Sequence, residues 1–97
     1  MTNSVFVVAK VVAKAGHESD LGNALLGLVD IARTEPGFIQ YDLHASVDNP
    51  AEFVFYEIWE NEALLEVHNN TNSMKAFGAM AGGWIEVVEI KKYKKIS

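Results

Sequence analysis

Residues 5–12 of the chain, VFVVAKVV, carry apolar side chains at both sets of alternating positions. Valine and phenylalanine favour β-strands, and a strand places successive side chains on opposite faces of its sheet. A strand that is apolar on both faces has to be covered on both. Any fold of this chain must therefore supply an apolar layer on each side of the sheet that contains this strand.

The remaining sequence predicts one layer of helices and three more strands. Apolar residues at helical spacing, turn-forming residues and β-prone runs mark the segments. The predicted elements are a helix over 15–37, strands over 38–45 and 52–60, helices over 61–70 and 73–81, and a last strand over 84–96. Asn61 and Asn72 are predicted to cap the two later helices, because asparagine readily accepts a hydrogen bond from a helix N-terminus.

This order of elements is that of the ferredoxin-like split βαβ fold, an α+β architecture with a four-stranded antiparallel sheet and helices on one face. The chain has 97 residues, so 1–97 is predicted to be a single domain. Helices cover only one sheet face in this fold, and the other face would expose an unusually large apolar patch. We therefore expect a homodimer that packs sheet against sheet with two-fold symmetry.

Composition excludes several classes of function. The formal net charge of -5 argues against a nucleic-acid or membrane partner, since binding to phosphates or anionic lipids needs a basic surface. The chain has no cysteine, which removes disulfides, thiolate nucleophiles and zinc-thiolate sites. It shows neither a secretory signal nor an apolar run long enough to span a membrane. The expected location is cytoplasmic.

The segment around Trp59 carries the candidate site. A period of two places Phe53, Phe55, Glu57 and Trp59 on one strand face, and the helix capped by Asn61 is expected to fold back over that face. His68, near the end of this helix, would then help to roof a cavity large enough for a small molecule. A simpler interpretation remains open, in which the histidine responds to the helix dipole and the tryptophan only packs.

Three other features are ambiguous or negative. Met74 and Phe77 lie at helical spacing and fit either core packing or a cavity wall. The turn before residue 52 does not fix the hairpin register, so either His44 or Tyr41 could lie on the face of Trp59. The three histidines come from three different elements, so no metal site is predicted. Neither a phosphate-binding glycine loop nor a nucleophilic serine motif is present.

The segments EPGFIQYDLH, FVFYEIWENEALLEVH and KAF resemble the antibiotic biosynthesis monooxygenase (ABM) family over nearly the whole chain. The resemblance implies a dimeric α+β barrel of ferredoxin-like protomers. It also implies oxygenation of a phenol- or quinol-type aromatic by dioxygen, without flavin, haem or metal. The substrate would supply the electrons, and the protein would bind it, orient it and remove a proton.

The resemblance also suggests roles for individual residues. His68 or His44 would be the catalytic base, and Trp59, also expected to be catalytic, would border the pocket and polarise or stack on the substrate ring. The residues expected to bind the substrate or shape the pocket are Phe53, Phe55, Glu57, His44, Met74 and Phe77.

Departures from the family pattern narrow this interpretation. Many relatives have a second histidine shortly after the position of His68, and this chain has Thr71, Asn72 and Ser73 there. Ala9 and Gly78 stand where the haem-degrading branch has asparagine and histidine, which argues against haem degradation.

Two alternative functions remain. One is a non-catalytic dimeric module that binds a small hydrophobic ligand. The other is isomerase-like processing of a small signalling metabolite, although the only arginine, Arg33, lies on the first predicted helix.

Overall fold

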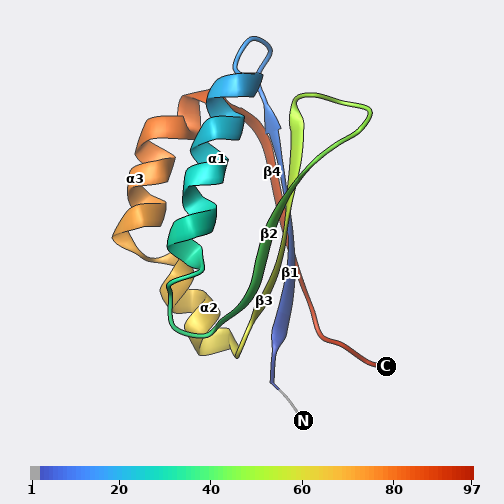
Figure 1. The fold of residues 1–97 in the computed structure, drawn as a ribbon, viewed down its shortest axis with the longest axis vertical. Helices are drawn as coiled ribbons and strands as arrows, with labels where there is room; N and C mark the ends of the chain where they lie inside the picture. Colours follow the sequence, from blue (N-terminus) through green and yellow to red (C-terminus); the bar gives the residue numbers. More distant parts are fainter. Residues whose placement is uncertain (1–2) are drawn as a thin grey trace.

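The computed structural model describes residues 3–97 and contains a four-stranded antiparallel sheet in the order β2-β3-β1-β4 (Figure 1). The strands are β1 (Val5–Ala13), β2 (Phe38–Ala45), β3 (Glu52–Trp59) and β4 (Ile85–Tyr93). The helices are α1 (Glu18–Ala32), α2 (Glu62–Asn69) and α3 (Asn72–Ala81), and a short 3₁₀ helix (Gly82–Trp84) precedes β4. The predicted element order and the ferredoxin-like fold are confirmed.

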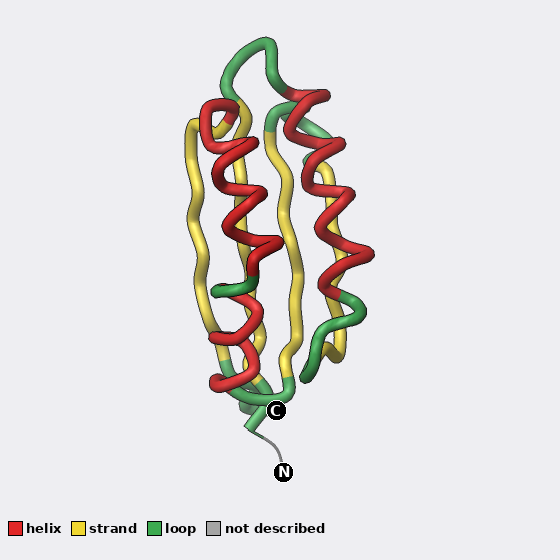
Figure 2. Tube along the Cα trace, turned by 90° about the vertical axis from the view of Figure 1, so that its left-hand side faces the viewer, coloured by secondary structure: helices red, strands yellow, loops and turns green. Residues whose placement is uncertain are grey.

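All three α-helices lie on the same side of the sheet. Figure 2 shows α1 beside the column formed by α2 and α3, with the strands behind them. The apolar stripe of α1 is buried against the sheet, and Leu21 and Leu25 are almost completely inaccessible to solvent. On the strand below, Val7 is buried in the same core. Burial of this stripe is what fixes the helix layer to the sheet.

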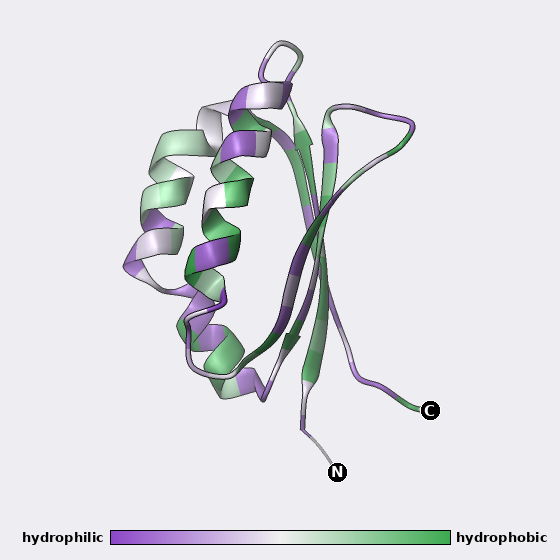
Figure 3. Ribbon diagram, viewed as in Figure 1, coloured by the Kyte–Doolittle hydropathy of each residue, from purple (hydrophilic) through white to green (hydrophobic). Residues whose placement is uncertain are grey.

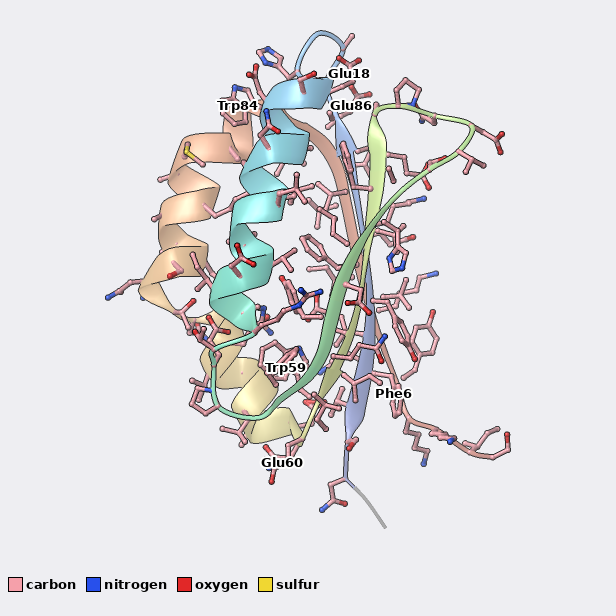
Figure 4. All side chains as sticks on the ribbon, viewed as in Figure 1. Phe6, Glu18, Trp59, Glu60, Trp84 and Glu86 are labelled. Carbon is pink, nitrogen blue, oxygen red and sulfur yellow. The ribbon has the colours of Figure 1, made fainter. Side chains whose placement is uncertain are left out.

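The two faces of β1 differ as the alternating pattern requires. Val5, Val7 and Val11 are buried beneath the helices, whereas Phe6 and Val8 point to the other face and are only half-buried. Figure 4 shows the same division, with Phe6 on the far side of the sheet from Trp59. Figure 3 shows hydrophobic residues along the strands as well as on the helices. Helices cover one apolar face of the sheet and leave the other uncovered.

The hairpin register, which sequence alone left open, depends on an irregularity in β2. Phe38 pairs with Trp59, but Ile58 pairs with Gln40, so Ile39 is an extra residue in the strand. Such a bulge shifts the following side chains by one position relative to a regular strand. As a result, Tyr41 faces the helices, and His44 faces the opposite side.

The N-terminal cap of α2 agrees with the sequence prediction, and that of α3 differs from it. Asn61 caps α2 as predicted, and its side chain accepts a hydrogen bond of 2.9 Å from the backbone N–H of Leu64. The predicted cap of α3 is wrong by one residue, since the Thr71 hydroxyl accepts from the N–H of Met74. Asn72 is instead the first helical residue. Threonine can cap a helix as asparagine does, because its side-chain oxygen accepts from the backbone N–H three residues later.

The loop between α1 and β2 is held tightly at Gly37. This residue has a φ of 82°, a left-handed conformation that L side chains adopt only at a cost. A Cβ built there would lie 2.6 Å from the Cβ of Leu64 on α2. The carbonyl of Gly37 also accepts a hydrogen bond of 2.8 Å from the N–H of Glu60. These contacts join the end of α1 to the junction between β3 and α2.

Gly37→Ala is therefore expected to destabilise the protein more than Gly16→Ala. Both glycines have positive φ, which costs an alanine about 1–2 kcal/mol, but the space around Gly16 is open. The overlap with Leu64 should add about 1–3 kcal/mol at Gly37 only. Denaturant unfolding of the two variants measures the difference. Equal losses would show that the α2 contact places no constraint on the loop.

Within residues 3–97, no helix is both long enough and apolar enough to cross a membrane.

Candidate active site

A cavity of about 140 Å³ lies between the sheet and the helix layer. Its walls are mostly apolar and come from β1, α1, β3, α3 and β4. They include Val11, Leu25, Phe55, Met74, Phe77 and Ile90. Five polar residues also line it: Tyr41, Glu57, His68, Asn69 and Lys92. An apolar cavity of about 150 Å³ has room for one benzene ring, so this space suits a single aromatic ring.

His68 turns inward from α2 and forms a close pair with Glu35. The distance between His68 Nδ1 and Glu35 Oε1 is 2.6 Å, and the two side chains are only 4% and 12% exposed. An ionised carboxylate has no hydrogen to donate, so Nδ1–H is the donor when Glu35 is charged. Nε2, the other ring nitrogen, has no hydrogen-bond partner among residues 3–97. His68 lies in the last turn of α2, as the helix-dipole interpretation requires, but it also forms a buried pair with Glu35 and lines the cavity.

Trp59 and Glu57 form the layer beneath His68. The indole N–H of Trp59 donates a hydrogen bond of 2.8 Å to Glu57 Oε1, and both side chains are buried. The indole also stacks on the His68 imidazole, with ring centroids 4.4 Å apart and planes 27° apart. Stacking on a fully buried tryptophan leaves the imidazole little freedom to tilt. Trp59 thus acts as a platform behind the histidine.

Tyr41 completes the polar end of the cavity. Its ring meets His68 edge to face at 5.4 Å and lies 4.9 Å from Phe55. The hydroxyl has no hydrogen-bond partner within the described part of the chain. Burial, and then the negative charges of Glu57 and Glu35, raise the pKa of Tyr41 well above its usual range. The phenol therefore stays protonated and is available as a donor to a molecule in the cavity.

The predicted site residues fall into two groups. Phe55, Glu57, His68, Met74 and Phe77 line the cavity. Trp59 does not, because His68 covers it. Phe53 packs against Gly22 on α1 and, with Leu43, lines a separate surface depression near the start of that helix. The predicted place of His44 and Phe53 in the cavity wall is wrong, since the β2 bulge turns His44 outward and Phe53 lies too far along β3.

Glu35 is absent from the predicted site, although the chain topology contains a signal for it. It lies in the connection that leads into Phe38, and Phe38 pairs directly with Trp59. This pairing places Glu35 at the same end of the sheet as α2, but it does not point to His68, which lies in the last turn of that helix. Tyr41 was one of two open alternatives, and only the bulge at Ile39 decides between them. Among residues 3–97, no group of three or more His, Cys, Asp or Glu is arranged to hold a metal ion.

One side of the cavity is open along the edge strand β4. Val88 and Ile90 face the helix layer and line the cavity, yet they are 53% and 62% exposed. The helices thus leave this edge uncovered, and a ligand has a route between β4 and α3. At the α2 end the amine of Lys92 bridges to both carboxylate oxygens of Glu62, at 3.1 and 3.2 Å. This ion pair joins the edge strand to α2.

The burial of Glu57 predicts that wild type and Glu57→Gln differ in stability by an amount that depends on pH. Burial raises its pKa, while the Trp59 hydrogen bond and nearby His68 only partly oppose the shift. Above about pH 4.5 an unfolded chain releases this proton before the folded one does, so the free energy of unfolding falls as pH rises. Glu57→Gln cannot ionise and still accepts from Trp59. Its stability relative to wild type should therefore increase between pH 4.5 and the higher pH at which folded Glu57 ionises.

Chemical denaturation of the two proteins across this pH range measures the effect. Glu86→Gln, which removes an exposed carboxylate, controls for the change in net charge. A difference between Glu57→Gln and wild type that does not vary with pH would contradict the prediction.

Comparison with known proteins identifies the family. Residues 4–80 match the sequence profile described as "Antibiotic biosynthesis monooxygenase". The chain belongs to the antibiotic biosynthesis monooxygenase family. This confirms the resemblance found in the sequence, and the match covers the elements that carry Tyr41, Glu57 and His68, from β1 to most of α3.

Solved structures similar to this ABM chain share its fold over nearly the full length. PA3566 from Pseudomonas aeruginosa is 30% identical, with a TM-score of 0.95 over 100% of this chain and 98% of that chain. SO0527 from Shewanella oneidensis is 26% identical, with a TM-score of 0.89 over 96% and 91%. Among curated proteins, "Putative monooxygenase YcnE" of Bacillus subtilis is 40% identical over 52 residues, which is 54% of this chain and 55% of YcnE. The chain spans about half the length of the curated relatives it matches.

Proposed function

We propose that this protein is a monooxygenase that uses dioxygen to oxidise a single-ring phenol or quinol bound in the cavity. The observation that carries the proposal is the position of His68, an imidazole with one free nitrogen at the polar end of an otherwise apolar cavity. Removal of water around a phenol strengthens its interaction with such a base. The cavity volume of about 140 Å³ supports one ring as the substrate size.

The proposed reaction begins with transfer of the phenolic proton to His68 Nε2. The phenolate passes one electron to dioxygen, and the resulting superoxide and phenoxyl radical combine at a ring carbon that carries hydrogen. The peroxide takes the proton back from His68. Loss of the ring proton and cleavage of the O–O bond then give a carbonyl and water. The substrate loses four electrons and dioxygen gains four, so no flavin, haem or metal is required.

Tyr41 and Glu57 have supporting roles in this proposal. The Tyr41 hydroxyl, kept protonated by burial, donates to an oxygen of the substrate. Glu57 lines the same end of the cavity, and the hydrogen bond from the Trp59 indole holds its carboxyl group in place. Phe55, Met74 and Phe77 pack against the ring and fix the carbon that meets dioxygen. This arrangement, with polar side chains at one end and an apolar body, supports a substrate that has a ring oxygen at one end and an apolar ring.

Oxygen uptake with a panel of hydroquinones, alkylphenols and naphthols tests the proposal. Single-ring quinols should be consumed faster than naphthols, because the second ring would have to extend out of the cavity along the open edge at β4. With isotopically labelled dioxygen, one labelled oxygen atom should appear in the product and the other in water. Binding of these compounds without oxygen uptake would instead identify a non-catalytic ligand-binding module, and the monooxygenase proposal would be abandoned.

We also propose that a second copy of the chain covers the outer face of the sheet. Phe6, Val8, Tyr56 and Ile58 lie together on this face, half-buried and apolar, and line a shallow depression with Tyr93 from β4. Both faces of the sheet carry apolar side chains, and the helices cover only one of these faces. Sedimentation at micromolar concentration should give about twice the mass of one 10.7 kDa chain, and Val8→Glu should lower it. A monomeric wild-type protein would contradict this proposal.

A further inference from the structure

We infer that Glu35 is a positioning residue for the proposed reaction: its carboxylate holds His68 with the proton on Nδ1, so that Nε2 is the free base at the cavity. The hydrogen bond made by one imidazole nitrogen determines which nitrogen carries the proton. Here Nδ1 meets a carboxylate oxygen at 2.6 Å, inside the protein. The catalytic part of this inference rests on the proposed function, whereas the effect on the tautomer does not.

Hydrogen bonds that do not involve its side chain fix the backbone of Glu35. Its N–H donates to the carbonyl of Ala32, and its own carbonyl accepts from the N–H of Phe38. Gly37, two residues on, is tied to Glu60 by a hydrogen bond of 2.8 Å. The loop therefore presents the carboxylate to α2 in one conformation, which is what a positioning group requires.

Competing partners for this carboxylate are engaged elsewhere. Arg33, two residues before Glu35, donates to the Tyr41 carbonyl at 3.2 Å and to the Asp42 carboxylate at 2.9 Å. The Glu35 carboxylate makes no other hydrogen bond or ion pair in the part of the chain that the structure describes. Its carboxylate is thus dedicated to His68, rather than shared with the surface.

Glu35 lies outside the cavity, so its role differs from that of a substrate-binding residue. It is not among the residues that line the cavity, and His68 stands between it and that space. When Nε2 takes a proton from the substrate, the imidazolium keeps Nδ1–H on Glu35, whose negative charge offsets the new positive charge. Glu35 accepts no proton in this step.

The test combines nuclear magnetic resonance with kinetics on Glu35→Gln. Nitrogen-15 shifts of His68, recorded as a function of pH, report which ring nitrogen carries the proton in the neutral imidazole. In wild type we expect Nδ1 protonated and Nε2 free. In Glu35→Gln the amide can either accept from or donate to Nδ1, so both tautomers should appear. The kcat for quinol oxidation should fall about 10- to 100-fold with little change in KM.

Glu60→Gln is the matched control, because this exposed glutamate precedes α2 but does not contact His68. It should leave both tautomer and kinetics unchanged. Protonated Nε2 in wild type would overturn the inference whatever the kinetics show. So would a Glu35→Gln protein that keeps the wild-type tautomer. If no quinol is oxidised but the tautomer shifts as expected, the positioning by Glu35 stands and the proposed function fails.

Discussion

Replacement of His68 by glutamine should lower the rate of quinol-dependent oxygen consumption by about 100- to 10,000-fold. This is the range usually lost when a general base is removed, and His68 is the only histidine that lines the cavity within residues 3–97. Glutamine fills a similar volume and can still accept from a substrate hydroxyl, so binding should persist. Oxygen-electrode rates measure the loss, and quenching of tryptophan fluorescence by the quinol measures the binding.

His44→Gln provides the comparison, because sequence alone left His44 as a rival base. In the structure His44 points away from the cavity, and its Nδ1 lies 3.2 Å from the carbonyl oxygen of Val54. Its replacement should leave the rate within about twofold of wild type, as is usual for a surface substitution far from the site. If His44→Gln loses activity and His68→Gln keeps it, the cavity described here is not the reaction site.

Trp59→Ala should produce the largest loss of stability, about 3–5 kcal/mol from the cavity it leaves. Trp59 is completely buried, and its indole donates to Glu57 at 2.8 Å. Its removal leaves that carboxyl without a donor, which adds about 1–3 kcal/mol. Trp59→Phe retains most of the packing but not the N–H, so it should lose mainly the second contribution. Denaturant unfolding of the three proteins separates the two effects.

Trp84→Phe is the matched substitution at the other tryptophan of the chain. Trp84 is only partly buried and stacks on His17 at a centroid distance of 6.2 Å. It should lose less than about 1 kcal/mol, in line with surface substitutions. If Trp59→Phe is no more destabilising than Trp84→Phe, the hydrogen bond to Glu57 contributes no net stability.

The fold and half of the site follow from local patterns in the sequence. A regular strand alternates its faces, so Phe55 and Glu57 could be placed beneath the helices without a structure. The contact between His68 and Glu35 could not, because it joins residues far apart in the chain across a loop whose path depends on Gly37. Cavity volume also depends on how side chains pack, which no periodicity encodes.

The orientation of Tyr41 shows a different limit. In a regular β2 strand following Phe38, the inward positions would belong to Gln40, Asp42 and His44. That arrangement would bury a carboxylate in an apolar cavity, and the bulge at Ile39 avoids it. The free-energy cost of burying Gln40, Asp42 and His44 favours the bulged backbone over a regular strand. Tertiary packing, not the strand's own sequence pattern, determines the register.

The chemistry of the cavity depends on the length of β2 after the bulge, because side chains alternate between the two faces of the sheet. Deletion of Ile39 would join Phe38 to Gln40 as regular neighbours and leave Tyr41 facing inward. One residue added between Gln40 and Tyr41 would reverse every later side chain, placing Asp42 and His44 inside the protein and the Tyr41 hydroxyl outside. Length variants of this strand are therefore more informative about the origin of the site than point substitutions. A chain one residue longer here would hold a different set of acids and bases on the same fold.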